Sequence, residues 1–121
     1  MPSNQSFGPD RRQSPRVDTD LYGSVDAGGR ELRCRVINLS RVGACALANR
    51  ELPEMASVRM RLSARNDDGA LEEATVEAAV VRCQRRADGL YDLGLFFTRI
   101  AEAHLAILDR VIAAHAPVAA G

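Results

Sequence analysis

The sequence predicts a mainly β fold, an antiparallel barrel or sandwich with one helix at its C-terminal end. Between residues 17 and 97, apolar and polar residues alternate over most of the chain, which is typical of strands with one buried side. Short segments rich in Asp and Gly separate the alternating runs, as hairpin turns do. After residue 100 the apolar residues recur every three or four positions, which indicates an amphipathic helix.

Five segments show the alternation of strands. Four of them lie near residues 17–22, 32–37, 58–64 and 90–97. In each, every second residue is expected on the buried face: Val17, Thr19 and Leu21 in the first; Leu32, Cys34 and Val36 in the second; Val58, Met60 and Leu62 in the third; and Tyr91, Leu93, Leu95 and Phe97 in the fourth. In residues 74–83, Val76 and Val80 share a face, and the pattern changes phase at Val81, which predicts a β-bulge or a change of exposure. Glu72 and Glu73 are expected at the edge of a loop.

Three glycine-containing segments separate these strands, at residues 26–29, 67–69 and 88–89, and glycine supplies the positive φ that hairpin turns need. The helix is expected between Ile100 and Ala116, with Pro117 ending it. Its apolar stripe consists of Leu105, Leu108, Val111 and Ile112. The stripe is expected to cover an open side of the barrel, and a dimer contact is the alternative.

The charge pattern narrows the possible partners. All 16 basic residues are Arg, they are balanced by 16 acidic residues, and the net charge is zero. A general DNA- or RNA-binding protein is basic overall, so a local anion site on a neutral body is expected instead. The chain has no apolar run that could span a bilayer, and its first residues lack the layout of a secretory signal. We therefore expect a cytoplasmic protein without membrane insertion.

The three cysteines, Cys34, Cys45 and Cys83, are single and widely spaced. This pattern is neither a disulfide framework nor a metal-binding motif, so buried thiols in strands and no metal site are expected.

Two segments contain candidate binding residues. Arg11, Arg12 and Arg16 precede the first strand, and the forked guanidinium group suits phosphate oxygens and the O6/N7 edge of guanine. The alternative for this cluster is a solvated, Arg-rich tail. The second segment, NLSRVGA, contains Asn38, Ser40 and Gly43 after a strand. On an extended backbone Asn38 and Ser40 point to the same side and offer an amide and a hydroxyl to a small ligand. The alternative is a Ser- or Asx-turn that joins two strands.

Together, RxxxR at Arg12 and Arg16 and NxSxxG from Asn38 to Gly43 resemble the bipartite signature of the PilZ domain family. The resemblance extends from about Arg11 to the end of the helix. It implies a six-stranded antiparallel β-barrel with a C-terminal α-helix. The corresponding boundaries are a flexible tail at 1–10, an Arg-rich ligand segment at 11–16, a barrel at about 17–98, a helix at about 100–116 and a tail at 117–121.

The resemblance also implies a function, namely a single-domain receptor for the second messenger cyclic di-GMP. Arg12 and Arg16 would hold phosphates and the outer edges of guanines, Asn38 and Ser40 would contact a guanine, and Gly43 would shape the turn. Arg11 is compatible with binding of a stacked ligand pair. The Arg segment is expected to become ordered on binding and to signal through a protein partner, with the chain a monomer or weak dimer.

Other function classes have less support in the sequence. An enzyme would need a nucleophile–base pair, a metal cluster or a phosphate-binding Gly loop, and GxxxxGK[ST], HExxH and GxSxG are absent from the sequence. We therefore expect no catalytic residues and no cofactor. A small barrel that binds nucleic acid would use aromatic platforms, and most of the few aromatic residues fall in predicted core strands. A ligand-independent interaction module is a further alternative, against which the intact motifs argue.

Overall fold

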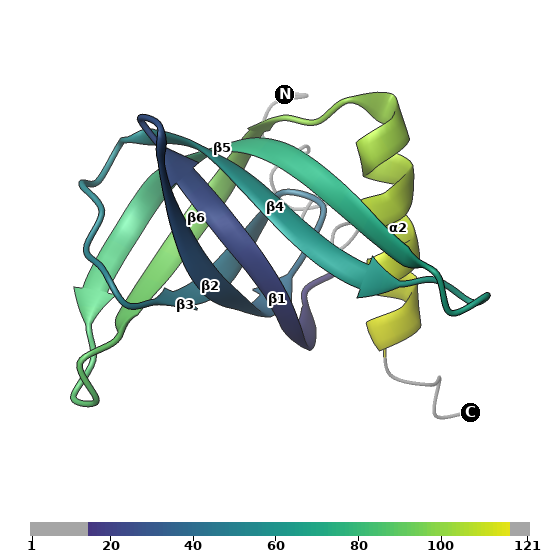
Figure 1. Ribbon diagram of the computed structural model, residues 1–121, viewed down its shortest axis with the longest axis horizontal. Coiled ribbons are helices and arrows are strands. Elements are labelled where there is room, and N and C mark those ends of the chain that lie inside the picture. Colours follow the sequence, from purple (N-terminus) through teal and green to yellow (C-terminus); the bar gives the residue numbers. More distant parts are fainter. Residues whose placement is uncertain (1–14, 117–121) are drawn as a thin grey trace, which may run out of the picture.

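The computed structural model describes residues 15–116, which form a closed six-stranded antiparallel β-barrel followed by one helix (Figure 1). Its elements are β1 (Val17–Ala27), β2 (Arg30–Leu39), β3 (Gly43–Ala48), β4 (Ser57–Arg65), β5 (Leu71–Arg85), β6 (Tyr91–Arg99) and α2 (Glu102–His115). The strand order is β1-β2-β3-β6-β5-β4, and β4 pairs with β1 to close the barrel. The predicted fold class is therefore confirmed. The tails at 1–10 and 117–121 lie outside the described residues.

The three predicted turns join neighbouring strands. Gly28 and Gly29 connect β1 to β2 with φ values of 61° and 84°, a backbone conformation that other residues adopt only with strain. Gly69 lies in the turn between β4 and β5, and Gly89 in the turn between β5 and β6. These turns account for three of the four pairs in which sequential strands are neighbours, and the loop after β2 accounts for the fourth, β2 with β3.

The predicted inward faces form the core. Val36, Met60, Leu62, Val80 and Leu93 are fully buried, and the alternation along each strand separates them from charged residues on the outer wall. The phase change predicted at Val81 is confirmed as a bulge, because Val80 pairs with Leu95 and Arg82 with Gly94, which leaves Val81 as an extra residue.

Two features differ from the expectations. The sequence pattern did not reveal β3, because its residues GACALA are small and have little β-propensity. Pairing with β2 and β6 holds this segment as a strand. Glu72 and Glu73 are not at a loop edge. They lie within β5, opposite Ala64 and Ser63, because the β4–β5 hairpin extends to Arg65 and Leu71.

The helix α2 covers the barrel as predicted, lying against β5 and β1 (Figure 1). Leu108, Val111 and Ile112 are buried in this contact. Two polar contacts fix its position on β5: Nδ1 of His104 accepts the Thr75 N–H at 3.0 Å, and Arg110 pairs with Glu72 at 2.9 Å. Within residues 15–116, no helix has the length and apolar character that a membrane span requires.

Candidate functional site

A bulge in β2 turns Asn38 onto the outer wall of the barrel. Val36 pairs with Ala46 and Asn38 with Cys45, so Ile37 is an extra residue in β2. Since side chains alternate along a strand, Asn38 would otherwise share the buried face of Val36. With the bulge, Leu39 fills the core and the Asn38 amide is half-exposed. The bulge therefore creates an accessible polar group at the end of β2.

Arg16 lies beside this amide, directly before β1. Its Nη1 donates a hydrogen bond to Oδ1 of Asn38 and lies 4.0 Å from the Sγ of Cys45. β1 and β2 are neighbours, and Asp18 pairs with Asn38, so the end of one strand meets the start of the other. The structure thus brings Arg16 and Asn38 together across 22 residues of sequence. Arg11 and Arg12 lie outside the described residues.

Ser40 organises the loop between β2 and β3. Its side chain is 1% exposed, and its Oγ accepts hydrogen bonds from the N–H groups of Val42 and Gly43, each at 3.2 Å. The Ser40 N–H donates to the Gly43 carbonyl at 2.9 Å. The hydroxyl therefore has the turn role that the composition of the segment allowed. The Ser40 hydroxyl is enclosed, whereas the Asn38 amide is accessible. Contact between the Ser40 hydroxyl and a ligand therefore stays a prediction.

Replacing Ser40 with alanine is expected to lower the free energy of unfolding by about 1–3 kcal/mol, because the buried N–H groups of the loop lose their acceptor. Denaturant unfolding measures this change. Ser63→Ala is the control, since Ser63 lies half-buried within β4, and it should stay within about 0.5 kcal/mol of wild type. Unchanged stability of Ser40→Ala, together with weaker ligand binding, would contradict the turn role.

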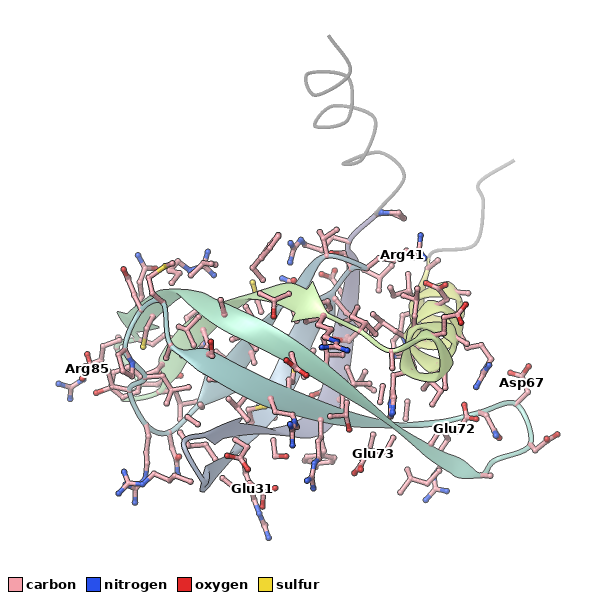
Figure 2. All side chains as sticks on the ribbon, turned by 90° about the horizontal axis from the view of Figure 1, so that it is seen from above. Glu31, Arg41, Asp67, Glu72, Glu73 and Arg85 are labelled. Atoms are coloured by element: carbon pink, nitrogen blue, oxygen red, sulfur yellow. The ribbon has the colours of Figure 1, made fainter. Side chains whose placement is uncertain are left out.

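Gly43 lies where the backbone of β6 leaves no room for a side chain on β3. It pairs with Phe96, and a Cβ at this position would run into the carbonyl oxygen of Leu95. In the same loop, Arg41 forms an ion pair with Asp109 of α2 at 3.0 Å, so the loop is also attached to the helix. Figure 2 shows Arg41 beside α2. Both contacts fix the loop that follows Asn38.

Arg82 lies beside these residues, although the sequence motifs do not include it. The strand register aligns Asn38 of β2, Cys45 of β3, Gly94 of β6 and Arg82 of β5 across four neighbouring strands. We call these four residues the outer row. The bulge at Val81 turns Arg82 onto the outer wall, as the bulge at Ile37 does for Asn38. The phase change at Val81 was the only sequence signal of this placement.

The side chain of Arg82 extends over Gly94 toward Cys45. Its Nη2 lies 3.5 Å from the Sγ of Cys45 and 3.3 Å from Oδ1 of Asp92. A Cβ on Gly94 would be 3.2 Å from the Cβ of Arg82, so glycine leaves the space for this path. The hydrogen bond to Cys45 is the largest cause of the raised pKa of Arg82; burial opposes it, and Asp92 contributes a smaller increase.

The outer row thus combines an amide, a thiol and a guanidinium, with the guanidinium of Arg16 beside the amide. Such an arrangement suits a ligand that carries both negative charge and hydrogen-bonding edges. Within residues 15–116, no three His, Cys, Asp or Glu side chains are grouped to hold a metal ion.

Sequence comparison identifies one family. The model of the family described as PilZ domain matches residues 10–114, which include both motif segments. No curated protein matches the sequence.

Solved structures share the fold. The PilZ domain of Escherichia coli YcgR with c-di-GMP matches with a TM-score of 0.64 and 17% identity, over 87% of this chain and 91% of that one. The inhibitor of motility MotI/DgrA of Bacillus subtilis gives 0.69 and 21% identity, over 81% of this chain. The match covers 47% of MotI/DgrA, so this chain corresponds to about half of that protein. Borreliella burgdorferi PlzA in complex with c-di-GMP gives 0.53 and 11% identity, over 97% and 59% of the two chains.

Proposed function

The chain belongs to the PilZ domain family, and from this premise we propose that it is a receptor for cyclic di-GMP. The observation that supports the proposal most directly is the contact of Arg16 with Asn38 on the outer wall. It joins one residue of each family motif, although the motifs are far apart in sequence. The same fold binds this dinucleotide in E. coli YcgR and B. burgdorferi PlzA.

The chemistry of the pair fits one end of the ligand. Guanine presents N1–H and N2–H donors on one edge and the O6 and N7 acceptors on another. Oδ1 of Asn38 has two lone pairs, so it can accept a guanine N–H beside the bond from Arg16. The fork of Arg16 matches a phosphate or the O6/N7 edge. Arg12 takes the equivalent role from the preceding segment, and Arg11 adds a third cation compatible with a stacked ligand pair.

Binding at this site also provides a route to signalling. We propose that the Arg segment at 11–16 becomes ordered around the ligand and presents a changed surface to a protein partner. The ordering costs conformational entropy, which lowers affinity and permits a reversible switch. In this role the protein is a cytoplasmic adaptor, a monomer or weak dimer, without a reaction of its own.

Calorimetric titration of the folded protein with cyclic di-GMP tests the proposal, and saturable binding is expected. Cyclic di-AMP is the matched control, because it has the same charge but lacks the guanine N1–H and N2–H donors. Cyclic di-AMP should bind far more weakly, since Oδ1 of Asn38 would lose the guanine N–H donors. A folded barrel that takes up no cyclic di-GMP at tens of micromolar would contradict the proposal, as would equal binding of the two ligands.

A further inference from the structure

Two guanidinium groups meet at the centre of the outer row. The Nη1 of Arg16 lies 4.0 Å from the Sγ of Cys45, and the Nη2 of Arg82 lies 3.5 Å from the same sulfur. Arg16 arrives from the start of β1, and Arg82 from β5, across β6. Two positive charges therefore lie within 4.0 Å of one sulfur atom.

Other groups offset these charges only in part. Among the described residues, Arg16 forms no ion pair, and its side-chain partners are the Asn38 amide and the Cys45 thiol. Arg82 has a carboxylate partner in Asp92 on one side, at 3.3 Å. The Nε of Arg82 is buried without a hydrogen-bond partner in this part of the chain. Because like charges repel at short range, an anion bound between Arg16 and Arg82 would stabilise both guanidinium groups.

We propose that a phosphodiester group of cyclic di-GMP sits over Cys45, between Arg16 and Arg82, so that Arg82 is a phosphate-binding residue of the site. This inference rests on the proposed function. It extends the ligand's footprint from β2 across β3 and β6 to β5. The floor between the two cations is flat, because Gly94 has no side chain and Cys45 has a short one.

The course of the Arg82 side chain over Gly94 favours a role in binding phosphate over a role in solubility alone. An exposed arginine that serves only solubility does not need a glycine beneath it or a thiol at its tip. Arg85 is the contrasting case on the same strand, since it is exposed and pairs only through its backbone with Tyr91. Figure 2 shows Arg85 at the opposite end of the barrel from Arg41, which lies in the loop between β2 and β3. Arg85 therefore serves as a matched control.

Titrations of Arg82→Gln, Arg82→Lys and Arg85→Gln with cyclic di-GMP test the inference. Arg82→Gln is expected to weaken binding by about 10–100-fold, the scale of a charged hydrogen bond. Arg82→Lys should recover most of this loss, because lysine binds phosphate as a point charge. Arg85→Gln removes the same net charge three residues further along β5, outside the outer row, and should change affinity by less than about twofold. Thermal unfolding of each variant verifies the fold.

The outcomes are distinguishable. If the wild type binds and Arg82→Gln behaves like Arg85→Gln, the inference is wrong and the proposed function stands. If Arg82→Lys loses as much affinity as Arg82→Gln, a phosphate contact is ruled out. If the wild type does not bind, the function and the inference fail together.

Alkylation gives a second readout that needs no amino-acid substitution. A phosphodiester over Cys45 should slow its reaction with iodoacetamide at least several-fold, measured by peptide mapping with and without cyclic di-GMP. Cys83, which is also half-buried but lies outside the outer row, is the internal control. Burial raises the pKa of Cys34 to about 11, so this thiol should stay unreactive. Equal rates at Cys45 with and without bound ligand would overturn the placement.

Discussion

Arg16→Ala is expected to lower the affinity for cyclic di-GMP by about 10–100-fold while leaving the melting temperature nearly unchanged. The loss corresponds to about 1.5–3 kcal/mol, the contribution of a hydrogen bond to a charged group. Stability should be preserved because Arg16 precedes β1, is exposed, and contacts only Asn38 and Cys45 through its side chain. Titration and thermal unfolding of the same preparation measure both quantities.

Arg30→Ala is the control for Arg16→Ala. Arg30 is an exposed arginine at the other end of β2, where that strand leaves the Gly28–Gly29 turn, so its loss changes net charge without touching the site. It should bind the ligand like the wild type. Arg12→Ala, in a residue outside the described part of the chain, should resemble Arg16→Ala. A fall in melting temperature that matches the loss of affinity would show that Arg16 supports the barrel instead.

The sequence was sufficient for the strands that have a strong pattern. In β4, valine, methionine and leucine alternate with two arginines, and the structure buries the apolar set. β3 was missed because Ala44, Ala46 and Ala48 face the core as small residues, and alanine indicates no strand by itself. Only the neighbours of β3 in the barrel make it a strand.

The candidate site was likewise predictable only where the sequence contains a recognisable pattern. The motifs identified Arg16 and Asn38, and their contact follows from the pairing of β1 with β2. The enclosure of Ser40 was not predictable, because no residue near Ile37 signals the bulge at that position. Arg82 meets Cys45 across 37 residues of sequence, and that contact depends on the register of three strands. Motif spacing contains no such information.

Gly43→Ala is expected to destabilise the barrel by about 1–3 kcal/mol or more, the usual range for overpacking a well-packed site. The new Cβ would meet the backbone carbonyl of Leu95, which cannot move aside as a side chain can. β3 would have to shift away from β6, and in a closed barrel this shift disturbs the pairing on both sides of the strand. The melting temperature should fall by roughly 5–15 °C.

The matched control for Gly43→Ala is Gly94→Ala, on the facing strand. The nearest atom to a Cβ at Gly94 is the Cβ of Arg82 at 3.2 Å, so a shift of a few tenths of an ångström between β5 and β6 relieves the contact, whereas a Cβ at Gly43 would overlap a backbone carbonyl oxygen. This variant should lose clearly less stability than Gly43→Ala. If both variants melted like the wild type, the close approach of β3 and β6 would not be what requires glycine at position 43. The role of Gly43 would then lie in ligand binding alone, because only a contact made in the complex would remain to explain its place in the motif.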